Sequence, residues 1–322
     1  MQNEFIKLAN ELGKQRKPFL FLVDFEMKKP VIIPLDECNG QDVFFQVPGS
    51  RNATNRVMND QVIKLQVFPM QKNDYAKAFQ GAQEHLNAGN SYLLNITFPT
   101  PIKIDHSLME IFFQAEAQYK LLYKDQFTIF SPECFIRTQS GHIYSYPMKG
   151  TIDADLPNAA QTILTDKKET WEHNTIVDLI RNDLSMVAQN ISVTKFRFLS
   201  EIHSNRKNLL QVSSEIRGEL NLDWQNRIGD ILWTLLPAGS ISGAPKKRTV
   251  EIIREAEKAD RGYFTGVFGV FDGKEIDSAV NIRYIERTKQ GLQFRSGGGI
   301  TANSDLNDEY NEMVDKVYVP LY

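Results

Sequence analysis

Cysteine is scarce in this sequence. Only Cys38 and Cys134 occur among its 322 residues, and neither belongs to a CxxC pair or is matched by a pair of histidines. A disulfide framework needs several spaced cysteines, and a zinc site needs paired ligands. The sequence therefore indicates neither, and we expect two buried or incidental thiols.

Long apolar runs and blocks of like charge are also missing. The N-terminus, Met1 to Phe5, lacks the basic start and apolar core of a signal peptide, and the run from Phe19 to Val23 is too short to span a bilayer. The net charge is −3, with no long basic block. We therefore expect a cytoplasmic protein that binds a small molecule, with no nucleic-acid or membrane partner.

The composition is that of a globular protein. It is 42% hydrophobic and 24% charged, and the chain is long enough for one large domain or two smaller ones. Hydrophobic periodicity predicts helices near residues 4–14, 74–88, 107–119, 166–188, 227–236 and 306–317. It predicts strands near 18–23, 31–33, 92–98, 126–130, 193–198, 263–284 (a hairpin) and 292–296. We expect Pro99 and Pro101 to end one of these strands, and Gly297 to Gly299 to end another.

One lysine lies between a proline and a glycine. The stretch Pro147-Met148-Lys149-Gly150-Thr151 follows an alternating run, so Lys149 would stand at a rigid strand end. Taken alone it is a solvated turn lysine, because lysine is seldom buried without a partner. Its meaning depends on what surrounds it.

Two predicted helices each carry a Glu-x-x-Glu pair beside an apolar stripe. In the helix that begins at the capping box Asp166 to Glu169, Glu169 and Glu172 project from the apolar side. In the last helix, Glu309 and Glu312 lie along the edge of such a stripe. A solvated i, i+4 pair explains Glu312 with Lys316 but not this repetition. Four carboxylates at the edge of a core fit a cage for a hard cation such as Mg²⁺.

Two glycine-rich stretches have different readings. Gly297-Gly298-Gly299 could aim several backbone N–H groups at a carboxylate or phosphate, or form a plain flexible turn, and both interpretations remain open.

The loop from Pro237 to Lys246 resembles a phosphate loop only superficially. Because Gly243 is followed by Ala-Pro-Lys and not by Lys-Ser/Thr, we exclude a Walker nucleotide site.

Taken together, these motifs resemble those of the chorismate-utilising enzymes, the family of anthranilate synthase component I, isochorismate and salicylate synthases, and aminodeoxychorismate synthase component I. The stretches that carry the resemblance, in family order over about residues 70 to 320, are Ser131-Pro132-Glu133, Pro147 to Thr151, Lys168-Glu169, Glu172-His173, Val177 to Asp183, Gly239 to Lys246, Arg261-Gly262-Tyr263, Ala279 to Arg283 and Gly297 to Lys316.

The resemblance implies an α+β fold, in which two large, mainly antiparallel sheets pack as a sandwich with helices outside and a buried site between them. Residues 1–322 would form one chorismate-utilising domain, with 1–65 as a shortened N-terminal part of the sandwich and 70–320 as the catalytic core. Whether a tryptophan pocket survives in the short N-terminal part stays open.

The resemblance also implies roles for single residues. Glu172 and Glu312 match the more direct Mg²⁺ ligands of the family, and Glu169 and Glu309 the supporting ones. The positions that match substrate-binding residues are Thr151, Tyr263, Arg283, Gly297, Gly299 and Lys316, of which Tyr263 and Arg283 would hold the enolpyruvyl carboxylate.

A few positions distinguish the reactions within the family. Isochorismate and salicylate synthases use a lysine to activate water where this chain has Leu93, which cannot accept a proton. Anthranilate synthases typically have alanine at the position that matches Lys149 and histidine at the position that matches Gln211. Lysine at 149 is the mark of aminodeoxychorismate synthases, where this amine attacks C2 of chorismate and the glutamate matching Glu133 protonates the leaving C4 hydroxyl.

That reaction needs a neutral Lys149, whose pKa a desolvated site next to a bound cation lowers, and a protonated Glu133, which burial favours. The aminodeoxychorismate synthase reaction is thus the leading hypothesis. Anthranilate synthase component I is the first alternative, and a catalytically silent chorismate-binding subunit the second.

The ammonia must come from elsewhere. Neither Glu37-Cys38-Asn39 nor Glu133-Cys134-Phe135 forms the Gly-x-Cys-x-Gly elbow of a glutamine amidotransferase. We therefore expect a separate glutaminase subunit as partner, with the aminated product leaving for 4-aminobenzoate and folate synthesis.

Overall fold

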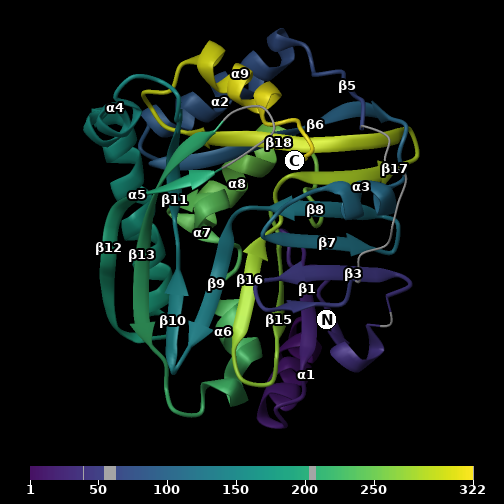
Figure 1. Ribbon diagram of the computed structural model, residues 1–322. Coiled ribbons are helices and arrows are strands. Elements are labelled where there is room, and N and C mark those ends of the chain that lie inside the picture. The colour runs from purple at the N-terminus through teal and green to yellow at the C-terminus, as the bar shows by residue number, and fades with distance from the viewer. Residues whose placement is uncertain (39, 54–62, 203–207, 322) are drawn as a thin grey trace.

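Two nine-stranded sheets dominate the computed structural model, which describes residues 1–38, 40–53, 63–202 and 208–321. Neighbouring strands run antiparallel, and helices surround the sheets (Figure 1). The predicted α+β sandwich is confirmed. In Figure 1, β9, β10, β13 and β16 run up the picture, while β7, β8 and β18 run across it.

The first sheet, sheet A, has the order β11-β13-β10-β9-β16-β15-β1-β2, with β12 paired to the free edge of β13. Its strands are β1 (Phe19–Val23), β2 (Val31–Pro34), β9 (Cys134–Gln139), β10 (His142–Ser145), β11 (Met148–Asp153), β12 (Gln189–Ile202), β13 (Leu209–Glu219), β15 (Val267–Phe271) and β16 (Ile276–Val280).

The second sheet, sheet B, has the order β14-β6-β18-β17-β8-β7-β3-β4, with β5 also paired to β6. Its strands are β3 (Val43–Val47), β4 (Ser50–Arg51), β5 (Leu65–Val67), β6 (Leu93–Ile104), β7 (Tyr119–Tyr123), β8 (Phe127–Ser131), β14 (Gly243–Ala244), β17 (Tyr284–Thr288) and β18 (Gly291–Ile300). The N-terminal strands β1 to β5 are thus divided between the two sheets.

The helices flank the sheets. They are α1 (Gln2–Lys14), α2 (Lys72–Asn87), α3 (Leu108–Gln114), α4 (Ala159–Thr165), α5 (Lys167–Ser185), α6 (Ile228–Leu235), α7 (Gly239–Ser242), α8 (Lys246–Glu257) and α9 (Leu306–Asp315), with 3-10 turns η1 (Leu35–Glu37) and η2 (Trp224–Arg227). Among the described residues, no helix combines the length and the apolar character that crossing a membrane requires.

Strand β1 shows how the core is layered. All five of its residues are buried, but they alternate between two clusters. Leu20 and Leu22 pack between the sheets with residues of β3, β7, β8 and β15, whereas Phe19, Phe21 and Val23 face the helices on the other side. A strand buried on both faces reads as a continuous apolar run, which is what the sequence shows here.

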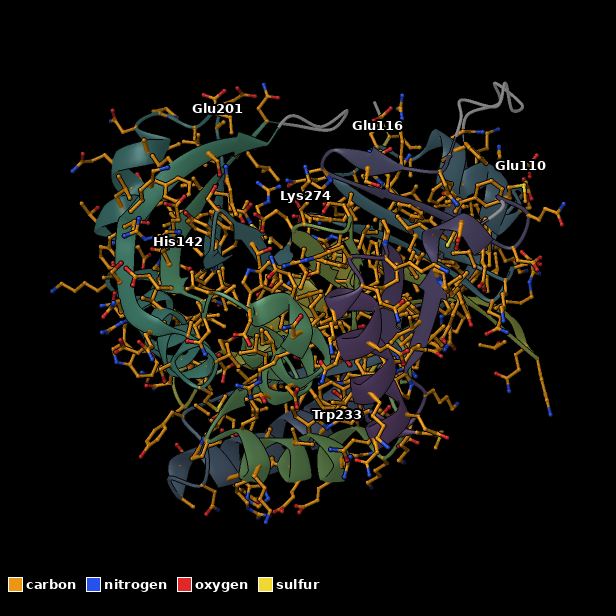
Figure 2. All side chains as sticks on the ribbon, turned by 90° about the horizontal axis from the view of Figure 1, so that it is seen from below. Glu110, Glu116, His142, Glu201, Trp233 and Lys274 are labelled. Carbon is orange, nitrogen blue, oxygen red and sulfur yellow. The ribbon has the colours of Figure 1, made fainter. Side chains whose placement is uncertain are left out.

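The N-terminal helix joins this second cluster. It lies against α6, where the rings of Phe5 and Trp233 are 5.7 Å apart (Figure 2). The side chain of Asn10 also donates to Asp230 and accepts from the backbone of Gly229. These contacts fix the first helix to the body of the fold.

Strand β6 does not end at its prolines. It continues to Ile104 through Pro99 and Pro101, which face Arg295 and Gln293 of β18. The N–H of Thr97, two residues earlier, points away from β18 and donates to the Glu257 carboxylate. Residues 99 and 101 share that direction, where the ladder needs no donor, so proline is tolerated there. The prediction that they end the strand was therefore wrong.

The triple glycine also differs from its prediction. Gly297, Gly298 and Gly299 continue β18, paired to Thr97, Ile96 and Asn95 of β6, and none has a positive φ. A Cβ at residue 297 would lie 2.1 Å from the carbonyl oxygen of Ile96. Glycine is required because two backbones approach closely, not because the chain turns.

We expect Gly297→Ala to destabilise the protein, because the added methyl group must push β18 away from β6. The free energy of unfolding, measured with urea, should fall by about 1–3 kcal/mol or more. The control is Gly81→Ala in α2, where a Cβ meets nothing within 4 Å. This control should gain up to about 1 kcal/mol. Equal stability of Gly297→Ala and the wild type would contradict the close approach.

Candidate active site

A cavity of about 160 Å³ lies between the two sheets and α5, α7 and the chain after α9. Its wall brings together segments that are far apart in sequence. The lining residues are Leu93, Asn95, Thr97, Glu133, Met148, Lys149, Ile176, Ser240, Ile241, Ser242, Gly243, Phe264, Thr265, Ile282, Arg283, Arg295, Ser296, Gly297, Gly299 and Lys316. Six of the predicted site residues are among them: Glu133, Lys149, Arg283, Gly297, Gly299 and Lys316.

Lys149 stands on an irregular part of β11. The pairing with β13 shifts between Met148 and Thr151, and Gly150 has φ 92°. The lysine side chain is mostly buried, and its Nζ lies 2.7 Å from Oε2 of Glu172 on α5. Lys149 is therefore not a solvated turn residue. It is the partner of a fully buried carboxylate.

The charge of Lys149 is held by its neighbours. Burial lowers the pKa of Lys149, but the carboxylates of Glu172, Glu312 and Glu169 outweigh burial and raise the pKa overall. The sequence-based expectation joins desolvation to a bound cation, and it stays a prediction. A lysine amine can act as a nucleophile only when it is neutral, so the charge of these carboxylates would have to be balanced first.

The two Glu-x-x-Glu pairs flank this ammonium. Three carboxylate oxygens from both pairs are buried without a hydrogen-bond partner in the described residues: Oε2 of Glu169, Oε1 of Glu172 and Oε2 of Glu309. Burial raises the pKa of Glu169 and of Glu309. For Glu312, burial is outweighed by Lys316 and Lys149, which lower its pKa.

These carboxylates fit a hard divalent cation by their chemistry. Oxygen ligands are what Mg²⁺ prefers, and buried oxygens without donors need a positive partner. A Cβ at Gly298 would lie 3.2 Å from Oε2 of Glu309 and 3.4 Å from Oε1 of Glu312, so the absence of a side chain leaves room beside them. In the described part of the chain, however, no three Asp, Glu, His or Cys side chains lie close enough together to coordinate one metal ion.

Glu133 lies opposite these charges, after β8. Its Oε1 accepts a hydrogen bond of 2.6 Å from the Ser240 hydroxyl on α7. Burial raises the pKa of Glu133, although this hydrogen bond and the charge of Lys316 oppose the shift. A carboxyl group with a raised pKa can keep a proton to donate, as the sequence analysis expected.

Arg283 and Lys316 form the cationic wall. The chain passes from sheet A to sheet B at residues 281–283, and Arg283 adopts φ 52° there. Its guanidinium donates to the carbonyl of Lys316 and lies 4.6 Å from the ring of Tyr318, while its buried Nε has no partner among the described residues. Lys316 Nζ contacts Oε1 of Glu312 at 2.5 Å and donates to the carbonyl of Gly297.

Two predicted substrate contacts lie elsewhere. The Tyr263 hydroxyl donates to the carbonyl of Lys29, and its ring packs against Phe127 outside the cavity. The neighbouring Phe264 lines the cavity instead, and both residues belong to the turn that precedes β15. Thr151 is exposed on β11 and does not line the cavity either.

Sequence reasoning missed Asn95 and Ser240. Asn95 lines the cavity on β6, and its buried Oδ1 has no partner among the described residues. Alternation along the strand from Leu93 could have placed it on the same face. Ser240 belongs to the stretch Gly239 to Lys246, which the resemblance includes without a role for this serine, and no pattern in the sequence links Ser240 to Glu133.

A buried ion pair fixes the cavity wall. Arg261 is 1% exposed and Glu257 4%, and Arg261 Nε donates to Oε2 of Glu257 at 3.0 Å. The same guanidinium donates to the carbonyls of Asn95 and Ile241 and to the hydroxyl of Thr265, all three of which line the cavity. One side chain thus connects β6, α7 and the segment before β15.

In chemical terms, the cavity presents a candidate acid, a primary amine and two cationic groups within one small enclosure. Such a site suits an anionic small molecule that undergoes a displacement at carbon. The sequence and the fold identify the class more closely.

The family described as chorismate binding enzyme matches residues 36–322. The chain is 53% identical over 319 residues to a Haemophilus influenzae protein named "Uncharacterized PabA-like protein", an alignment that covers 98% of this chain and 96% of that one. It is 30% identical over 264 residues to "Aminodeoxychorismate synthase component 1" of Salmonella typhimurium, covering 77% of this chain and 57% of that one.

Among solved structures, the menaquinone-specific isochorismate synthase MenF of Escherichia coli superposes with a TM-score of 0.73. The match covers 98% of this chain and 80% of that one at 15% identity, which supports the fold alone. The fold is that of a two-sheet sandwich shared with this synthase. The chain belongs to the chorismate binding enzymes.

We expect Glu257→Ala to unfold the cavity wall, because it leaves the buried Arg261 guanidinium without a counter-charge. Breaking a buried pair from one side costs about 3–5 kcal/mol in the free energy of unfolding. The control is Asp74→Ala, which breaks an exposed pair with Lys77 on α2 and should cost no more than about 1 kcal/mol. Similar losses in the two variants, measured by urea unfolding, would refute a special role for the buried pair.

Proposed function

We propose that this enzyme aminates chorismate at C4, as aminodeoxychorismate synthase component I does, and that Lys149 forms a covalent intermediate. One observation carries the proposal: Lys149 and the acid Glu133 line the same cavity, while Leu93, where a water-activating lysine stands in related enzymes, is apolar. The 30% identity to an aminodeoxychorismate synthase component 1 agrees with it.

The reaction consists of two displacements. The neutral amine of Lys149 attacks C2 of chorismate, both ring double bonds shift to C1=C6 and C4=C5, and the C4 hydroxyl leaves as water with the proton of Glu133. Ammonia then attacks C4, both double bonds shift back, and the bond between C2 and the lysine nitrogen breaks. Chorismate and ammonia thus give 4-amino-4-deoxychorismate and water, and the enolpyruvyl group is retained.

The cationic wall positions the substrate. Arg283, with its unpartnered Nε, and Lys316 are suited to the carboxylates of chorismate. Backbone groups at Gly297 and Gly299 approach the ligand closely because neither residue has a side chain. Thr151 and Tyr263 lie outside the wall of this cavity, and their predicted contacts with the substrate stay predictions.

We propose that Glu172 and Glu312 hold Mg²⁺, with Glu169 and Glu309 in support. When bound, Mg²⁺ neutralises and positions the ring carboxylate of the substrate. The three unpartnered oxygens of Glu169, Glu172 and Glu309 support the assignment. The pKa of Lys149 falls when these carboxylates are neutralised, because their charges are what raises it.

Ammonia is supplied by a separate glutamine amidotransferase subunit in this proposal. Hydrolysis of glutamine by such enzymes needs a thiolate. Burial raises the pKa of Cys38 to about 11 and that of Cys134 to about 12, so neither thiol is an activated nucleophile. The product would serve the synthesis of 4-aminobenzoate and folate.

We expect Lys149→Ala to lose amination by about a thousandfold or more, because the covalent route needs the amine. The assay supplies chorismate, Mg²⁺ and ammonium at alkaline pH and follows 4-amino-4-deoxychorismate by chromatography. Lys167→Ala, an exposed lysine on the neighbouring helix, should keep wild-type activity. Fluorescent anthranilate with pyruvate from the wild type would instead show an anthranilate synthase, and saturable binding without turnover a silent subunit.

We expect Mg²⁺ to raise the thermal midpoint of the wild-type protein. Selective binding to the folded state stabilises it by about 2.7 kcal/mol at a hundred times the dissociation constant. The double variant Glu172→Gln/Glu312→Gln should lose this stabilisation, whereas Glu251→Gln, on the exposed face of α8, should retain it. An equal effect of Mg²⁺ on all three proteins would rule out the assigned ligands.

A further inference from the structure

A second cavity, of about 20 Å³, adjoins the first across Glu133 and Ser240, which line both. It lies between β9, β10, α5 and the segment that joins α6 to α7. Its other lining residues include Ser145, Ile180, Asp183, Leu184 and Ala238, none of which reaches the larger cavity. We refer to it as the small cavity.

The small cavity has room for one molecule the size of water or ammonia. A cavity needs roughly 10–15 Å³ of such volume to hold one water, and this one has little more. Four of its lining residues have polar side chains: Glu133, Ser240, Ser145 and Asp183. Ser240 donates to Glu133, Ser145 donates to the carbonyl of Phe135, and Asp183 pairs with Lys246, so these oxygens can serve a guest as acceptors. The remaining wall is apolar, so a single hydrogen-bonding guest fits and chorismate does not.

The side of the cavity at Asp183 is bounded by a partly exposed ion pair. Lys246 Nζ lies 2.9 Å from Oδ1 of Asp183 and also donates to the carbonyl of Leu235. The exposed fractions of the two side chains are 21% and 10%. The small cavity therefore extends from the acid Glu133 to charged groups that water can reach.

The proposed reaction requires a path for ammonia beside Glu133. The inference about the small cavity therefore rests on the proposed function. In that reaction nitrogen ends at C4, the carbon that loses the hydroxyl group, and Glu133 must contact that hydroxyl to protonate it. The incoming ammonia must therefore reach the position beside Glu133 after water has left it.

We propose that the small cavity is the binding site from which ammonia reaches C4, entering past Glu133. Ser145, Asp183 and the Glu133–Ser240 pair supply hydrogen-bond partners for one ammonia molecule. The Ser240 hydroxyl holds the Glu133 carboxylate at the boundary of the two cavities, so one group serves both displacements.

The proton balance is consistent with this arrangement. In the first displacement Glu133 gives its proton to the leaving hydroxyl and becomes a carboxylate. In the second, the ammonia lone pair forms the C4–N bond, the lysine nitrogen leaves C2, and the new C4 ammonium group returns a proton to Glu133. The acid is regenerated, and no other reactant is needed.

The test compares two amines in three variants that alter the size of the small cavity or leave it unchanged. We measure kcat/KM for methylamine and for ammonium, and take their ratio. Ile180→Val removes a methylene group from the wall of the small cavity, so the ratio should rise by roughly tenfold. Ala238→Val fills the cavity and should lower kcat/KM for ammonium by a similar factor. Ile216→Val, a buried site that lines neither cavity, is the matched control and should leave the ratio unchanged.

The outcomes separate this inference from the proposed function. If the wild type aminates chorismate but the ratio in Ile180→Val equals that of the control, the small cavity is not the ammonia site. Because a ratio does not depend on how much protein is folded, Ile180→Val decides the matter even if Ala238→Val fails to fold. If the wild type makes no aminated product, the proposed function itself fails.

Discussion

The site depends on one buried interaction, the ion pair between Arg261 and Glu257. Charges this deeply buried are stable only when all their donors and acceptors are matched. Arg261 donates to Glu257, Asn95, Ile241 and Thr265 and stacks over the ring of Phe25, so it connects β6, α7 and the segments that follow β1 and precede β15. Glu257 in turn accepts from the backbone and hydroxyl of Thr97 on β6. The wall opposite Lys149 is set by this network.

Within that frame, charge balance governs the chemistry. Four carboxylates on α5 and α9 face Lys149 and Lys316, and three of their oxygens lack donors in the described part of the chain. The ammonium of Lys149 pairs with Glu172, and the neighbouring carboxylates raise the pKa of Lys149. The same carboxylates are the proposed ligands of Mg²⁺. The proposed cation and the proposed nucleophile would thus depend on one set of negative charges.

The sequence was sufficient for features that follow from local pattern. Asp166 caps helix α5, and its side chain accepts from the N–H of Glu169 as the capping motif predicts. One glutamate of each pair, Glu172 and Glu309, is buried, in keeping with the apolar side that periodicity assigned to the pairs. Features that depend on another strand were missed or misread. Whether Pro99 ends a strand depends on where its missing N–H points, and whether Gly297 turns depends on how close β6 lies. Tyr263 and Phe264 lie in the turn before β15, where the alternation of a strand does not decide which of two neighbours faces the cavity. The hydrogen bond from Ser240 to Glu133 joins residues with no periodic relation, so no pattern could reveal it.

The most direct test of the central claim is to look for the covalent intermediate itself. The wild-type protein is incubated with chorismate and Mg²⁺ without ammonia, and its intact mass and peptide map are determined by mass spectrometry. We expect the mass of the protein to increase by that of chorismate less one water, with the adduct on Lys149, and we expect the adduct to disappear when ammonium is added. A protein that turns over chorismate and ammonium at full rate without any adduct on Lys149 would contradict it.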